Sequence, residues 1–153
     1  MAESHSILPT NRFMTSLSFP DVNVWLALML QHHLHRASAL AWWEQMTGTA
    51  AFLRLTQVSV LRLLTTAATM DGRPLTMADA WQAYDRLFDD DRVAVYPEPH
   101  DFDARFRQLA NAPVASPKVW ADAYLLAFAS GHQGQVVTFD RAMENRGSCL
   151  VLR

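Results

Sequence analysis

The chain of 153 residues has the length of one domain, and such a domain typically buries roughly 68–70% of the surface that its unfolded chain exposes. Half of the residues are hydrophobic and 18% are charged, which argues against global disorder. The formal net charge of −2 and the pI of about 6.3 lack the strongly basic balance of many nucleic-acid-binding proteins, but they are compatible with a small local RNA site.

The cysteine count and the apolar runs narrow the class of protein further. Cys149 is the only cysteine, which excludes an intrachain disulfide and a cysteine metal cluster and suits a reducing cytoplasm. The longest wholly apolar run, residues 24–30, has seven residues, whereas a membrane span needs about 20. We therefore expect a cytoplasmic protein without a membrane partner. Residues 1–14 are expected to form a flexible N-terminal extension, and residues 15–153 the folded domain.

Hydrophobic periodicity predicts strands that alternate with helices along the chain. In chain order the pattern gives strand 16–22, helix 25–30, helix 34–46, strand 51–55, helix 57–68, helix 76–88, strand 92–96, helix 102–110, helix 117–130, strand 135–138, a short helix from residue 140 and strand 149–152. Gly48 is predicted to end the second helix, and Thr56 to N-cap the third. Thr76 and Asp79 have the spacing of a capping box.

Alternating strands and helices imply a parallel sheet that helices cover on both faces. Ligands of such sheets bind beyond the carboxyl ends of the strands. The polar residues just past predicted strand ends, or early in the following helix, are Asp21, Asn23, Thr56, Ser59, Asp122, Thr138 and Asp140.

Four segments resemble the ordered motifs of PIN domains, in particular those of VapC-like toxin ribonucleases. They are FPDVNVWLAL at residues 19–28, TQVSVLR at residues 56–62, WADAYLLA at residues 120–127 and VTFDRAM at residues 137–143. Each motif alone is weak, but the four occur in the family's order and span nearly the whole domain.

The resemblance implies a three-layer α/β/α fold with a parallel sheet of four or five strands in the order 3-2-1-4-5. It also implies metal-dependent cleavage of RNA by the toxin of a type II toxin–antitoxin pair. On this basis Asp21, Asp122 and Asp140 are the catalytic and metal-binding acids, and the cofactor is Mg²⁺ or Mn²⁺. The supporting residues are Asn23, Thr56, Ser59 and Thr138, and the candidate RNA contacts are Arg62, Lys118 and Arg141.

The resemblance further implies a VapB-like antitoxin partner, a homodimer, and an RNA substrate for which transfer RNA is one candidate. Aspartate oxygens suit Mg²⁺ and Mn²⁺, which prefer hard oxygen ligands. Many PIN domains carry a glutamate where this chain has Ser59, which favours one tightly held ion over two. Glu44 and Asp103 are the alternative carboxylates, and the sequence places neither in the site.

Structural explanations exist for several of these residues. Asp21 and Asp140 can cap helices, and the negative charge of Asp122 can interact favourably with the dipole of a helix that begins just before it. His32, His33 and His35 fit a surface or a link between helices better than a zinc site, because the HExxH pattern is lacking.

Two other functions compete with the nuclease. A catalytically degenerate PIN domain that binds RNA or protein would explain Ser59. A haloacid-dehalogenase-like phosphatase could use Asp21, but it requires a second aspartate two residues later, where this chain has Asn23.

Overall fold

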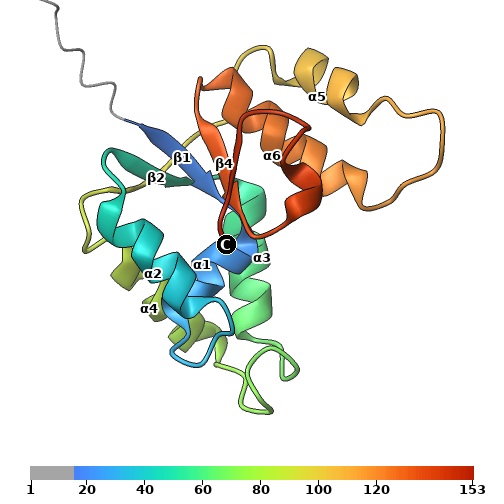
Figure 1. The fold of residues 1–153 in the computed structure, drawn as a ribbon. Coiled ribbons are helices and arrows are strands. Elements are labelled where there is room, and N and C mark those ends of the chain that lie inside the picture. The colour runs from blue at the N-terminus through green and yellow to red at the C-terminus, as the bar shows by residue number, and fades with distance from the viewer. Residues whose placement is uncertain (1–15) are drawn as a thin grey trace, which may run out of the picture.

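The computed structural model describes residues 16–153, and the expected extension over residues 1–14 lies outside them. The fold is a five-stranded, all-parallel sheet in the order β3-β2-β1-β4-β5, with helices on both faces (Figure 1). The strands are β1 (Leu17–Pro20), β2 (Thr49–Phe52), β3 (Val93–Val95), β4 (Gln135–Thr138) and β5 (Cys149–Val151). The expected sheet order and layering are thus confirmed.

Six α-helices and one 3₁₀ helix connect the strands of the described residues. They are α1 (Val22–Met29), α2 (Arg36–Gln45), α3 (Arg54–Leu64), α4 (Met77–Leu87), α5 (Phe102–Ala110), α6 (Val119–Gly131) and η1 (Arg141–Met143). The bounds of α5 and β4 agree with the predicted ranges, because proline or glycine lies close to both segments. None of the helices in residues 16–153 has the length and apolar character that a membrane crossing requires.

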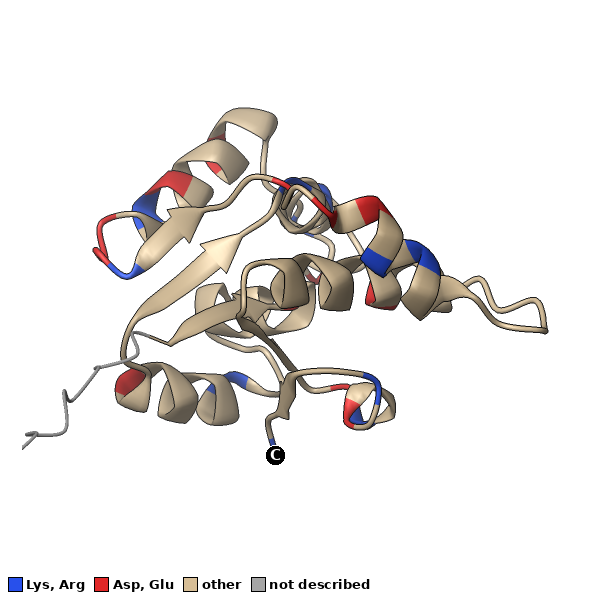
Figure 2. Ribbon diagram, turned by 90° about the horizontal axis from the view of Figure 1, so that it is seen from above, with Lys and Arg blue, Asp and Glu red and all other residues tan. Residues whose placement is uncertain are grey.

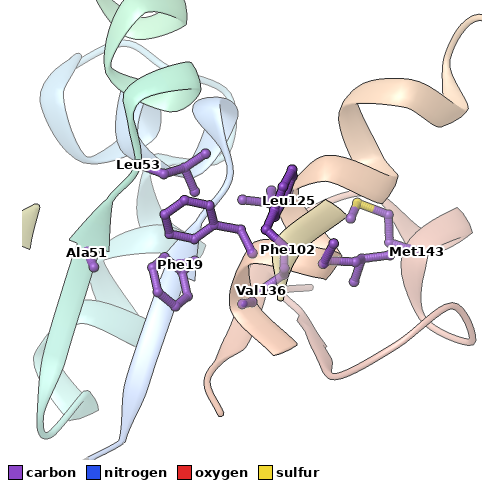
Figure 3. Packing of buried hydrophobic residues seen from close by; sticks show 11 residues of the cluster. Phe19, Ala51, Leu53, Phe102, Leu125, Val136 and Met143 are labelled. Carbon is purple, nitrogen blue, oxygen red and sulfur yellow. The ribbon is translucent and has the colours of Figure 1, made fainter. Parts of the chain in front are cut away.

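Side chains of alternating strand positions build a separate core on each face of the sheet. Ala51 packs with α5, α6 and η1 in the cluster that Figure 3 shows around Phe19 and Leu125. Ala50 and Phe52 point to the other face, where Phe52 stacks on the fully buried Trp25 with ring centroids 4.0 Å apart. Since both faces are covered, β1 and β4 are held rigidly at the centre of the molecule.

The pairing of β1 with β4 sets the position of the site. Pro20 lies opposite Val137, and the backbone N–H of Asp21 continues the ladder with a 2.8 Å hydrogen bond to the carbonyl of Val137. The residues that follow the two strands therefore emerge side by side at the carboxyl edge of the sheet.

The boundaries around β2 differ from the prediction. The strand is Thr49–Phe52, and α3 already begins at Arg54, so that Thr56 lies buried inside the helix and is not its N-cap. The N-cap position belongs to Leu53, which makes no side-chain capping bond. Burial of Leu53 and Thr56 in the tertiary structure overrides the local capping preference of threonine.

Gly48 also has a role other than the predicted one. The second helix ends at Gln45 with Met46 as its C-cap, whereas Gly48 adopts a φ of 95° in the link to β2. A Cβ at Gly48 would collide with the backbone of Ser16. The glycine is therefore required by a close approach of two backbone segments.

Candidate active site

Asp21 occupies the junction between β1 and α1. Its Oδ1 accepts a 2.7 Å hydrogen bond from the backbone N–H of Val22, so the side chain caps α1 as its position suggested. Its Oδ2 accepts a second hydrogen bond, 3.1 Å long, from the hydroxyl of Thr138 at the end of β4. Capping and a role in the site are therefore compatible, because the cap holds the carboxylate at the edge of the sheet.

Thr138 links two of the three predicted acids. It is 1% exposed, and besides donating to Asp21 its Oγ1 accepts a 3.1 Å hydrogen bond from the backbone N–H of Asp140. Asp140 in turn caps η1 through a 2.9 Å bond from the backbone N–H of Ala142 to its Oδ1. A single buried hydroxyl thus fixes the geometry between Asp21 and the segment that carries Asp140.

Asp122 comes to the same edge from the first turn of α6. It makes no capping bond to that helix; instead its Oδ2 lies 3.3 Å from Nη1 of Arg146, and both side chains are about three-quarters buried, with 27% and 28% exposed. Arg146 belongs to the segment between η1 and β5, and sequence reasoning missed it. Its position just before the last strand was the only signal that could have drawn attention to it.

The charges of the three aspartates influence one another. Burial raises the pKa of Asp21, and the charge of Asp140 raises it further against the hydrogen bonds from Val22 and Thr138. Burial likewise raises the pKa of Asp122, where Arg146 acts in the opposite direction and Asp140 and Asp21 add repulsion. Carboxylates from three separate chain segments are therefore close enough for their charges to disfavour the ionised forms of Asp21 and Asp122.

The thiol of Cys149, on β5, lies near the same carboxylates. Burial raises the pKa of its thiol, and the further causes are the charges of Asp21, Asp140, Glu144 and Asp122. In the described part of the chain, however, no three His, Cys, Asp or Glu side chains lie in an arrangement that could hold a metal ion without some movement of the side chains. The arrangement is an open acidic edge with Arg146 as a cation against Asp122.

The predicted supporting residues come from different elements. Asn23 is exposed on α1, one turn or less from Asp21, whereas Thr56 and Ser59 lie on α3, and among residues 16–153 neither is found hydrogen-bonded to the aspartates. The alternative carboxylates lie elsewhere: Glu44 is exposed on α2, and Asp103 pairs with Arg107 on α5 at 2.7 Å.

The predicted RNA contacts occupy different surfaces. Arg141 directly follows Asp140, and Lys118 is the N-cap residue of α6, four positions before Asp122. Arg62 is exposed on α3 and lines an apolar groove between α3 and α4. Acidic and basic residues are interspersed along the ribbon in the view of Figure 2.

Comparisons with known proteins agree with this fold. The family model of the PIN domain matches residues 18–147. Ribonuclease VapC41 of Mycobacterium tuberculosis is 41% identical over 133 residues, which cover 83% of this chain and 91% of the relative. The chain therefore belongs to the PIN-domain family, in its VapC group.

Solved structures of low sequence identity share the fold. The crystal structure of M. tuberculosis VapC20, described as a toxin that cleaves the sarcin–ricin loop, has a TM-score of 0.66 at 15% identity and covers 89% of this chain and 99% of its own. VapBC-1 from nontypeable Haemophilus influenzae has a TM-score of 0.63 at 12% identity, with 88% and 97% covered. Membership of the family excludes the expected alternative of a haloacid-dehalogenase-like phosphatase.

Proposed function

We propose that this protein is a divalent-metal-dependent endoribonuclease and the toxin of a VapBC-like pair, with one PIN domain over residues 15–153. The observation that carries the proposal is that Asp21, Asp122 and Asp140 come from three chain segments to one edge of the sheet, where burial, and to a lesser extent the neighbouring carboxylates, raise the pKa of Asp21 and of Asp122. Mutually repelling carboxylates at the carboxyl edge of a parallel sheet are unfavourable for folding alone, and such arrangements occur at functional sites. The names of the VapC relatives give independent support.

The donor set fits Mg²⁺ or Mn²⁺. Aspartate oxygens are hard ligands, and a divalent cation would neutralise the repulsion among Asp21, Asp122 and Asp140, which are the residues that would hold it. When bound, such an ion lowers the pKa of a water ligand and offsets charge on the phosphate. Arg146 pairs with Asp122, and if Asp122 held the ion instead, the Arg146 guanidinium would be free to bind the RNA phosphate.

Thr138 and Asp140 have different roles in the proposed reaction. Thr138 holds the Asp21 carboxylate and the backbone of Asp140 in one orientation through its two hydrogen bonds. Asp140 is the exposed member of the three, and we assign to it the orientation and deprotonation of the attacking water. The oxygen of that water bonds to phosphorus in line, its proton passes to Asp140, the bond to the leaving ribose oxygen breaks, and that oxygen takes a proton from solvent water to become a hydroxyl.

Ser59 favours a single tightly held ion. Ser59 stands where many PIN domains have a carboxylate, and its hydroxyl is neutral. Two cations in one site would repel each other, and without that carboxylate the protein has less negative charge to offset the repulsion. Any second ion then arrives with the RNA, whose phosphate supplies the missing negative charge.

The antitoxin partner has a candidate surface on α3 and α4. A groove of about 560 Å³ there contains Leu61, Met77 and Trp81, and the latter two side chains are 72% and 47% exposed. Arg54 and Arg62 also line the groove. We assign it to an amphipathic antitoxin segment with apolar anchors and flanking acidic residues, which would complement both features. A second copy of the toxin, as a homodimer, is the competing occupant.

The experiment that tests the nuclease is incubation of a total transfer-RNA pool with the purified toxin, free of antitoxin. Cleavage is expected with Mg²⁺ or Mn²⁺, is lost with a chelator, and is lost in Asp122→Asn. Asp91→Asn is the matched control, because Asp91 is exposed and lies away from the three acids. Equal cleavage by wild type and Asp122→Asn would refute the mechanism.

A catalytically degenerate module is the second candidate, because Ser59 replaces a carboxylate and Arg146 neutralises another. A Mg²⁺ titration followed by calorimetry distinguishes the two functions. A nuclease requires saturable binding that Asp21→Asn abolishes, whereas a degenerate module binds RNA or protein without the ion.

A further inference from the structure

A cleft of about 510 Å³ extends along α1 from the neighbourhood of the acids. Asn23, two residues after Asp21, lines it at the start of the helix, and His32 and His33 line it beyond the helix end. The opposite wall comes from the link between α3 and α4 and includes Arg73. Figure 1 shows the α1–α2 and α3–α4 links next to each other at the end of the molecule away from the N-terminal trace.

The turn that carries the histidines is fixed by hydrogen bonds. Nη1 of Arg36 donates to the carbonyl of Leu28 at 2.9 Å, which satisfies one of the free carbonyls at the end of α1. Nδ1 of His33 accepts a 3.1 Å bond from the backbone N–H of His35. In the neutral imidazole the proton then resides on Nε2, so His33 presents a hydrogen-bond donor.

An aromatic contact joins this turn to the acidic edge. The ring of His35 stacks on Phe139, with centroids 4.4 Å apart and an interplanar angle of 24°. Phe139 lies between Thr138 and Asp140 in the chain, so the stack positions the turn against the segment that carries a proposed catalytic acid. The turn that lines one end of the cleft is therefore held against the segment that carries Asp140, and Asn23 lines the cleft two residues after Asp21.

We propose that this cleft binds the single-stranded stretch of RNA next to the scissile phosphate, with Arg73, His32 and His33 contacting its phosphates. The inference rests on the proposed nuclease function. The eight residues of α1 rise about 12 Å, which is enough to separate the scissile phosphate from at least one further phosphate along the strand. Asn23 and Gln31 add amide groups that can bond to riboses or bases.

The composition of the cleft favours RNA over a protein segment. Arginine, imidazole and amide groups line it together with one acid, Asp71, above a floor that includes Leu26, Leu30, Leu63 and Met70. The groove between α3 and α4 instead offers the exposed Met77 and Trp81 as anchors for a protein helix. Phosphate contacts position a strand without reading its sequence, so the cleft sets register and the acids perform the cut.

The test is binding of a fluorescent, mixed-sequence, single-stranded RNA to the full chain in an Asp140→Asn background, which silences cleavage. Arg73→Glu is expected to weaken binding roughly tenfold and to reduce the salt dependence by about one phosphate contact. His32→Ala is expected to weaken it severalfold. Arg86→Glu, at an exposed position in the last turn of α4, is the control with the same charge change.

Three outcomes would overturn the inference: no RNA binding by the parent, equal losses in Arg73→Glu and Arg86→Glu, or loss of antitoxin binding in Arg73→Glu with RNA binding intact. Circular dichroism confirms that each variant is folded, and Mg²⁺ binding should be unchanged in Arg73→Glu. If the wild type binds RNA through Arg73 but never cleaves it, the cleft stands and the proposed nuclease function fails. If the wild type cleaves RNA independently of Arg73, the proposed nuclease function stands and the proposed role of the cleft fails.

Discussion

Replacement of Asp21 with asparagine is expected to stabilise the metal-free protein while it abolishes cleavage. The carboxylate is partly buried, lies near Asp140, and has a raised pKa because burial and repulsion outweigh its hydrogen bonds. An asparagine keeps Oδ1 as acceptor for the N–H of Val22, and its amide can donate to the Thr138 hydroxyl. This reverses the wild-type bond and leaves the buried hydroxyl proton of Thr138 without its carboxylate acceptor, a cost of about 1 kcal/mol.

The change in the free energy of unfolding can be worked out from the interactions that Asp21→Asn weakens and those that it relieves. Two hydrogen bonds to a charged group become two neutral ones, which forfeits about 1 kcal/mol for each. In return, the variant avoids desolvating an ion, a penalty of several kcal/mol, and removes the repulsion from Asp140. We therefore expect a net gain of about 1 kcal/mol, or about 2–4 °C in Tm for a domain of this size.

The stability difference between wild type and Asp21→Asn should also depend on pH. Because the folded-state pKa of Asp21 is raised above 3.8, the native wild type binds this proton more tightly than the unfolded chain does. Wild-type stability should therefore rise as the pH falls through the folded-state pKa towards 3.8, and Asp21→Asn should lack this component. The advantage of the variant is then full at neutral pH and disappears below the unfolded pKa.

Thermal and urea unfolding in chelator, between neutral pH and pH about 4, measure these differences. Asp91→Asn is the control, and as an exposed substitution it should change stability by less than about 0.5 kcal/mol. A lower Tm of Asp21→Asn at neutral pH would refute the account, because it would mean that the carboxylate's hydrogen bonds outweigh its desolvation and repulsion.

Further substitutions test other parts of the site and fold. Saturating Mg²⁺, at about 100 times its Kd, should stabilise the wild type by about 2.7 kcal/mol, and calorimetric scans should find this shift absent in Asp122→Asn. Arg146→Ala should tighten Mg²⁺ binding severalfold in a titration by removing the cation that competes for Asp122; weaker Mg²⁺ binding would contradict this. Trp81→Glu should weaken antitoxin binding at least tenfold without altering cleavage by the free toxin, whereas unchanged affinity would exclude the groove. Gly48→Ala should lower the free energy of unfolding by about 1–3 kcal/mol, and an unchanged midpoint in urea would show that the Ser16 backbone can move.

The sequence determined the order of strands and helices because each element carries its own periodicity and punctuation. Residues 102–110 and 135–138 were predicted with the observed bounds, and Thr76 accepts the expected hydrogen bond from the N–H of Asp79. The segment around β2 was displaced, because TAAF and the following leucines fit a strand or a helix equally well until burial against the neighbouring strands decides between them.

The three aspartates could be named from their motifs, and Asp21 and Asp140 could be named as helix caps, since both signals are local. Only the tertiary structure decided that these caps share the hydroxyl of Thr138, that Arg146 faces Asp122, and that a histidine turn stacks on Phe139. The physical reason is that local propensities act over a few neighbouring residues. The Thr138–Asp21 contact instead depends on the parallel register of β1 and β4, which joins segments more than 100 residues apart, and the Arg146–Asp122 contact depends on how α6 lies beside the segment before β5.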